Sequence, residues 1–175
     1  MIEQGPRRIE EYRFTPAADH PPPVKYFDSL PVAIVYERSA NGDRSARIYS
    51  AHELVTDRKP ILPVVESLHA DRGPDDILKI YFDALHVADV EATLQTFTEA
   101  GYMQHSNGER HVGTEKLCAA FTKFFKTGPI NLRYCNKTDA GDITALECYM
   151  PSGRPAVAVY HRASRDKVLA ARLYL

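Results

Sequence analysis

A stretch near the start of the sequence returns at its end, and this internal repeat limits the folds that the chain can adopt. Residues 31–50 read PVAIVYERSANGDRSARIYS, and residues 155–175 read PAVAVYHRASRDKVLAARLYL. When one residue is allowed as an insertion in the turn, the copies agree at the following positions: Pro31 and Pro155, Val35 and Val159, Tyr36 and Tyr160, Arg38 and Arg162, Ala46 and Ala171, Arg47 and Arg172, Tyr49 and Tyr174. A Gly-Pro step precedes each copy, at residues 5–6 and 128–129. We interpret the chain as one and a half copies of a β-sheet unit.

The first 50 residues carry strand patterns. Short β-rich runs at 9–14 and 24–27 are separated by three prolines, and the run at 32–38 is joined to 44–49 across Asn41-Gly42, a strong hairpin signal. Since no helical pattern is found here, this sheet must cover its apolar face with another part of the assembly. Residues 51–73 are predicted to be a linker, because Pro60 and Pro63 interrupt the helix that residues 50–53 could start.

From Pro74 onward the pattern changes to helices and then back to strands. Apolar residues at helical spacing predict a first helix from residue 75 to about 85, a second from Asp89 to Gly101, and a third from Thr114 to the Gly-Pro at 128–129. Strands are expected at 130–136, 143–150, 156–162 and 168–175. Three helices followed by four antiparallel strands predict an α+β domain over residues 74–175, with a curved sheet around the first helix.

Composition and charge exclude several classes of function. The 175 residues fit one domain, or one domain plus a fragment, and the net charge of -1 disfavours nucleic acid and anionic membranes as partners. The longest apolar run, at 155–160, is too short to span a membrane, and the start lacks a signal peptide's apolar core, so we expect a cytoplasmic protein. The three cysteines and seven histidines lack metal-site spacing, and no Gly-rich phosphate loop occurs, so no metal, disulfide framework or cofactor is expected.

Residues 78–125 and the ending at 172–175 resemble the nuclear transport factor 2-like superfamily, which includes ketosteroid isomerases and SnoaL-like polyketide cyclases. The resemblance rests on an aromatic-containing helix, on Ala88-Asp89 before the second helix, on His105 before a loop and on Gly113 before the third helix. It covers about 100 of the 175 residues. It implies a cone-shaped, curved antiparallel sheet wrapped around three helices, also described as a cystatin-like roll, with an apolar pocket and here an extra N-terminal β segment.

The same resemblance suggests catalytic residues. Tyr81 falls at the tyrosine with which ketosteroid isomerases stabilise the enolate oxygen, and His105 falls at their general base, which is an aspartate in that family. An imidazole can accept a proton at neutral pH. The isomerases' second oxyanion donor falls on or near Ala158, which donates nothing. Because the loss of one such donor costs roughly 10²- to 10³-fold in rate, ketosteroid isomerase activity is expected to be weak or absent. The alternative role of Tyr81 is packing in the core.

Other residues are expected around the pocket or on the outer face of the sheet. The predicted ligand-binding residues are Tyr102, His111, Ala158, Tyr160 and Leu175. By strand alternation His161 points to the outer sheet face, where we expect an interface. Arg162 is expected to be a solvated charge at the end of its strand.

Two functions from different classes fit these residues. One is a cofactor-free acid/base isomerase or cyclase acting on a small apolar ketone or a polyketide-like substrate. The other is a non-catalytic ligand-binding or assembly module. The expected partners are a small apolar ligand and a second β-sheet. That sheet comes either from a second chain, in a homodimer through the sheet face, or from the chain's own residues 5–50, which would pack on residues 128–175 as an intramolecular pseudo-dimer. Residues 5–50 could also be exchanged between two chains. A rival arrangement adds the N-terminal strands to the edge of the cone's sheet.

Overall fold

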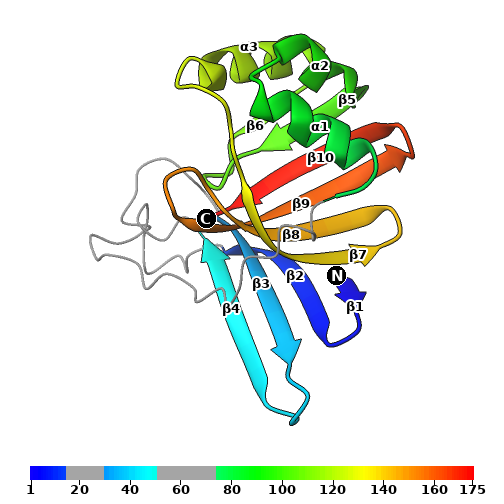
Figure 1. Cartoon of the computed structure of the whole chain (residues 1–175), viewed down its shortest axis with the longest axis vertical. Coiled ribbons are helices and arrows are strands. Elements are labelled where there is room, and N and C mark those ends of the chain that lie inside the picture. The colour runs from blue at the N-terminus through cyan, green and yellow to red at the C-terminus, as the bar shows by residue number, and fades with distance from the viewer. Residues whose placement is uncertain (15–29, 51–73) are drawn as a thin grey trace.

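The computed structural model describes residues 1–14, 30–50 and 74–175, and its strands form two separate sheets. The smaller sheet is antiparallel, in the order β1-β2-β3-β4, and contains β1 (Ile2–Gln4), β2 (Arg7–Phe14), β3 (Leu30–Arg38) and β4 (Arg44–Ser50). The larger sheet has the order β6-β5-β10-β9-β8-β7 and contains β5 (Phe97–Gln104), β6 (Arg110–Val112), β7 (Arg133–Ala140), β8 (Ile143–Tyr149), β9 (Pro155–Ser164) and β10 (Lys167–Tyr174). Only β5 and β10 run parallel among these pairs of described strands. The N-terminal strands therefore do not extend the edge of the larger sheet (Figure 1).

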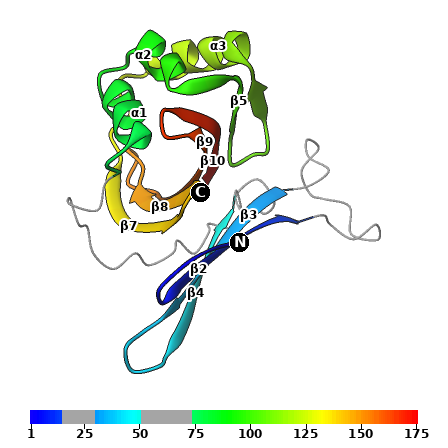
Figure 2. The ribbon, with the colours of Figure 1, turned by 90° about the vertical axis from the view of Figure 1, so that its right-hand side faces the viewer.

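Three helices lie on the concave side of the larger sheet, which curls around them (Figure 2). They are α1 (Ile77–His86), α2 (Val90–Gln95) and α3 (Thr114–Phe125). The carboxylates of Asp76 and Asp89 cap α1 and α2, each accepting a hydrogen bond of 2.9 Å from a backbone N–H of the first turn. The apolar faces of α1 and α3 pack on the sheet in the main core, which buries Leu78 and Leu117 completely. The predicted α+β class is confirmed.

The second helix is shorter than predicted. It ends at Gln95, and Phe97 begins strand β5, which pairs in parallel with β10 from the far end of the sequence. Gly101 lies inside this strand rather than at a helix end, and a Cβ there would lie 2.9 Å from the Thr98 carbonyl oxygen. Strand β1 was not predicted from the sequence. The strand expected at 24–27 lies outside the described residues. Of the helix start expected at 50–53, only residue 50 is described.

The two sheets pack face to face, which gives the larger sheet a second apolar core on its outer side (Figure 2). The smaller sheet contributes Ile2, Ile9, Ala33, Val35 and Tyr49, and the larger sheet contributes Ala145, Val157, Val159 and Tyr174, with Ile143 at the border. Strand β1 adds a polar contact at the edge, where the Gln4 side-chain oxygen accepts a hydrogen bond of 2.8 Å from the backbone of Asp139. Each face of the larger sheet therefore covers a different core.

Strand pairing shows that β1–β4 repeat β7–β10. In the smaller sheet Val35 pairs with Ile9 and Arg47, and in the larger sheet Val159 pairs with Ala145 and Arg172. Arg47 and Arg172 are matched by the repeated sequences, whereas the equivalence of Ile9 and Ala145 comes from the structure alone. The structural repeat begins before residue 31, because the strands β2 and β8 correspond as well.

The Gly-Pro steps at residues 5–6 and 128–129, in contrast, are not equivalent. Arg38 and Arg162 donate their backbone N–H groups to the carbonyl oxygens of Pro6 and Asp142, at 3.0 and 2.7 Å. Gly5 therefore corresponds to Gly141, and both adopt positive φ, at 58° and 74°. The prediction that the two Gly-Pro steps are equivalent was therefore wrong, because a match of only two residues does not determine the register of the strands.

Candidate functional site

An apolar cavity of about 240 Å³ lies between the helices and the concave face of the larger sheet. Its apolar walls come from α1, α3, the segment before β7 and strands β9 and β10, and include Leu85, Phe121, Ile130, Ala158, Ala171 and Leu173. Polar side chains reach the cavity from α1, β9 and the end of β5. They are Tyr81, Tyr160 and His105. Gln104 and Arg172 also border the cavity, but their side chains bind Arg110 and Glu11 on the outer side of the sheet.

Tyr81 is placed by the helical period of α1, which turns it inward between Leu78 and Leu85. The residue is 4% exposed, and its ring makes edge-on contacts with four aromatic rings, those of Phe82, Phe97, Phe121 and Tyr160. Within the described chain its hydroxyl has no hydrogen-bond partner. Burial raises the pKa of this phenol far above 10, so it stays protonated and can donate a hydrogen bond to a ligand.

Tyr160 faces the same cavity from strand β9. Its ring centroid lies 5.7 Å from that of Tyr81, and the residue is also 4% exposed. Burial, together with the nearby Tyr81 phenol, raises the pKa of Tyr160 well above its usual value. Among the residues described, its hydroxyl likewise has no hydrogen-bond partner. The cavity therefore holds two protonated phenols from opposite walls.

His105 follows directly after β5 and lies half-buried beside the cavity. A backbone turn fixes it, because its N–H donates to the Glu109 carbonyl at 2.9 Å and its carbonyl accepts from Gly108 at 2.9 Å. Its ring contacts the edge of Phe124 at 4.9 Å between centroids and that of His111 at 5.2 Å. Burial, and then the positive charge that His111 can carry, lower the pKa of His105. Its imidazole is therefore neutral at pH 7 and can accept a proton.

Ala158 and Tyr160 line the cavity, but three other predicted ligand-binding residues do not. Tyr102 points away, since its hydroxyl accepts a hydrogen bond from Arg172 at 3.2 Å on the side toward the smaller sheet. His111 packs behind His105, with its Nε2 atom 3.6 Å from Glu109. Leu175 follows the last residue of β10, and Leu173 faces the cavity instead.

Gln104 and Arg172 border the cavity through their strands, but their side chains lie on the outer side of the sheet. Gln104 is 4% exposed, and its side-chain oxygen accepts a hydrogen bond of 2.6 Å from Arg110. Arg172 is held by Glu11 of strand β2 through two bonds, of 2.7 and 2.9 Å. The sequence repeat marks Arg172 as the counterpart of Arg47, and in the structure its side chain contacts the smaller sheet.

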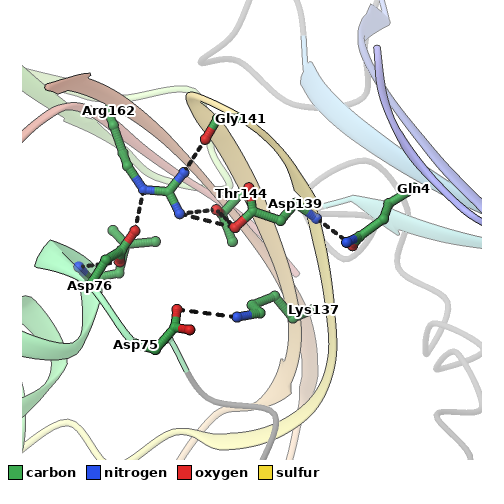
Figure 3. A network of polar contacts seen from close by, with 9 residues as sticks. Gln4, Asp75, Asp76, Lys137, Asp139, Gly141, Thr144 and Arg162 are labelled. Atoms are coloured by element: carbon green, nitrogen blue, oxygen red, sulfur yellow. Dashed lines mark hydrogen bonds and ion pairs between the residues drawn. The ribbon is translucent and has the colours of Figure 1, made fainter. Parts of the chain in front are cut away.

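Arg162 was expected to be solvated, but its side chain is 10% exposed and lies in a polar network (Figure 3). It donates to the Gly141 carbonyl at 2.6 Å, to Thr144 at 2.5 Å and to Asp139 at 3.1 Å. Its Nε atom forms an ion pair of 2.5 Å with Asp76, although the geometry is not that of a hydrogen bond. Because Asp76 also caps α1, Arg162 fixes the start of the helix that carries Tyr81.

His161, which was expected on the outer face of the sheet, contacts Asp142 in the turn after β7 at 3.0 Å. Its side chain is 33% exposed.

The described residues contain no group of three or more His, Cys, Asp or Glu side chains that could hold a metal ion. In the same part of the chain, none of the helices combines the length and hydrophobicity needed to cross a membrane.

Comparison with known proteins shows the fold. No family model matches the sequence, and no curated protein matches it. Among solved structures, a SnoaL-like protein of unknown function from Burkholderia thailandensis is similar with a TM-score of 0.50 and 19% identity, over 56% of this chain and 91% of that one.

A second similar structure is a hypothetical protein with a ketosteroid isomerase-like fold from Catenulispora acidiphila, solved in complex with trimethylamine. Its TM-score is 0.50 at 14% identity, over 57% of this chain and 84% of that one. At such identities the similarity concerns architecture alone. The chain therefore has the fold of the nuclear transport factor 2-like superfamily, as found in SnoaL-like and ketosteroid isomerase-like proteins.

Proposed function

We propose that this protein is a cofactor-free acid/base catalyst, an isomerase or a cyclase, acting on a small apolar ketone or a polyketide-like substrate. The observation that carries the proposal is the set of groups at one apolar cavity: a neutral imidazole, His105, and two protonated phenols, Tyr81 and Tyr160, whose hydroxyls have no hydrogen-bond partner among the described residues. Polar groups are costly to bury unpaired, so their presence here supports a ligand that bonds to them.

The chemistry follows from these groups. An imidazole nitrogen of His105 takes a proton from the carbon next to the substrate's carbonyl, and the electrons of that C–H bond move to the carbonyl oxygen. Tyr81, with Tyr160 as a second donor, hydrogen-bonds the resulting enolate oxygen. In an isomerisation the imidazolium returns the proton to another carbon. In a cyclisation the enolate carbon attacks a second carbonyl of the same substrate, and the imidazolium protonates the new alkoxide.

Cavity size limits the substrate. Pockets for drug-sized ligands measure roughly 300–1,000 Å³. A cavity of about 240 Å³ therefore fits a compact ketone or the reactive end of a longer molecule, and it is too small to enclose a steroid. The apolar walls favour a substrate without charge near its reactive carbon, because they would not solvate one.

The test is proton exchange at carbon. Small ketones are incubated with the protein in D₂O, and loss of the α-proton signal is followed by NMR. We expect faster exchange with the wild type than with buffer alone, loss of the acceleration in His105→Gln, and an unchanged rate in the matched control His161→Gln, whose ring lies outside the cavity. Equal rates for His105→Gln and the wild type would contradict the proposed base.

The second candidate is a non-catalytic ligand-binding module. It is favoured by Ala158, which offers no hydrogen bond where the isomerases have their second donor, and by the packing of Tyr81 among four rings. A panel of ketones that bind in the cavity without any accelerated exchange would support this candidate over the catalyst.

A further inference from the structure

Two clusters of the same composition join the two sheets. In the first, Arg47 of β4 binds Glu147 of β8 through bonds of 2.7 and 2.8 Å, and Tyr49 donates its hydroxyl proton to Glu147 at 2.7 Å. In the second, Arg172 of β10 binds Glu11 of β2 through bonds of 2.7 and 2.9 Å, and Tyr174 donates its hydroxyl proton to Glu11. Arg47 with Tyr49 and Arg172 with Tyr174 are matching positions of the sequence repeat.

The two glutamates also match each other. Glu11 pairs with Ala33 in the strand ladder of the smaller sheet, and Glu147 pairs with Val157 in the larger sheet. Ala33 and Val157 occupy the same position of the repeat, two residues after its first proline. Each sheet therefore presents one glutamate and one Arg-Tyr pair, and each glutamate meets the Arg-Tyr pair of the other sheet.

The apolar contacts follow the same rule. The core between the sheets contains Ile9, Ala33, Val35 and Tyr49 from one side and their counterparts Ala145, Val157, Val159 and Tyr174 from the other. Contacts in which position i of one unit meets position j of the other, and j meets i, define a two-fold interface. Here the two units are parts of one chain.

The outer face of the larger sheet is not suited to solvent or to an unrelated apolar surface. Glu147 is 1% exposed and receives a further hydrogen bond of 3.2 Å from Asn136. A carboxylate buried to this extent needs a positively charged partner. Its partner, Arg47, has an 11% exposed side chain and comes from the smaller sheet.

We propose that the outer face of the larger sheet is a self-complementary docking surface for a second copy of this chain, and that residues 1–14 and 30–50 act as a built-in partner that keeps the second chain out. The wild-type protein is therefore one chain per particle. When the smaller sheet is displaced, the larger sheets of two chains pair, so that Glu147 of each binds Arg172 and Tyr174 of the other. This proposal does not depend on the proposed catalysis.

The two clusters differ in one contact. In the first cluster the third nitrogen of Arg47 binds Glu37 at 2.9 Å, whereas in the second that of Arg172 binds the Tyr102 hydroxyl at 3.2 Å.

The experiment uses full-length variants and measures molar mass by light scattering after size-exclusion chromatography. In E11K/R47E both clusters between the sheets carry like charges, while Glu147, Arg172 and Tyr174 are unchanged. We expect one chain's mass for the wild type and two chains' mass for E11K/R47E. The matched control is E11K/R47E/E147R/R172E, in which both pairs are restored with reversed charges, and we expect it to return to one chain's mass.

Circular dichroism and thermal unfolding establish that each variant is folded. A wild type of two chains, or a folded E11K/R47E that keeps one chain's mass, would overturn the proposal. Should E11K/R47E fail to fold, the proposal requires the fourfold variant to recover a folded, single-chain particle, and lack of recovery overturns it as well.

Discussion

The rings of Tyr81 and Tyr160 are in edge-on contact at the cavity, with centroids 5.7 Å apart and planes at 61°. One residue comes from α1 and the other from β9, so the helix and the sheet each bring one phenol to the same space. This contact gives the candidate site two hydrogen-bond donors, although Ala158 offers none.

Removing either phenol hydroxyl is expected to slow proton exchange without unfolding the protein. Loss of one donor to a developing oxyanion typically costs about 10²- to 10³-fold in rate. We expect Tyr81→Phe to show a loss of this order, because we propose its hydroxyl as the main donor to the enolate oxygen. Tyr160→Phe should lose less, as the second donor. Equal exchange rates for Tyr81→Phe and the wild type, measured with the same ketone, would show that Tyr81 only packs.

The pH profile of exchange reports the protonation of His105. Burial lowers the pKa of this imidazole below its ordinary 6.5, and the catalytic form is the neutral one. The rate should therefore be lost as pH falls through a pKa below 6.5 and should be constant at neutral pH. On the alkaline side the plateau should extend past pH 10, because the pKa values of Tyr81 and Tyr160 are raised.

His111 offers a check on that profile. Its charge is one of the causes that lower the pKa of His105, so His111→Gln should raise this pKa and move the acid limb to higher pH. The shift follows from electrostatics, since a neutral side chain no longer repels the His105 imidazolium. An acid limb that stays in place in His111→Gln would mean that a group other than His105 sets it.

The two glutamates between the sheets should differ in their effect on stability. Glu147 has a 2% exposed side chain, and replacing it by alanine leaves Arg47 buried without its main partner, which we expect to cost about 3–5 kcal/mol of unfolding free energy. Glu11 has a 26% exposed side chain, so water can solvate Arg172 in its absence, and Glu11→Ala should cost about 1–3 kcal/mol. Urea unfolding of both variants measures the difference, and equal losses would contradict the role of burial.

Arg162 is expected to be irreplaceable by lysine. Its guanidinium contacts Asp76, Asp139, Thr144 and the Gly141 carbonyl in several directions, which a single ammonium group cannot reproduce. Arg162→Lys should lose about 1–3 kcal/mol in urea unfolding. The control Arg165→Lys, at an exposed position nearby, should change stability by less than about 0.5 kcal/mol.

Sequence reasoning succeeded where local spacing determines the structure. The three- and four-residue period around Tyr81 predicted both α1 and the inward side of that tyrosine, and the alternation in β9 predicted that Ala158 and Tyr160 share a face. The repeat likewise identified corresponding residues such as Arg47 and Arg172. Each of these inferences needed only residues within one element or between two similar sequences.

It failed where partners come from distant parts of the chain. Residues 97–101 look helical on their own, but pairing with β10 makes them a strand. Arg162 looks solvated at its strand end, but it meets Asp76, which caps α1, and Asp139 from β7. Tyr102 was assigned to the cavity, but Arg172 holds it on the opposite side. Such contacts depend on tertiary packing, which cannot be predicted from the spacing of apolar residues or from secondary-structure propensity.

The covalent link between the two sheets changes how their contact responds to dilution. Two separate chains that share a two-fold interface come apart when their concentration falls below the dissociation constant. A sheet tethered to its target keeps a fixed effective concentration however dilute the solution is. The contacts of Arg172 with Glu11, and of Arg47 with Glu147, would then be the same in a scarce protein as in an abundant one.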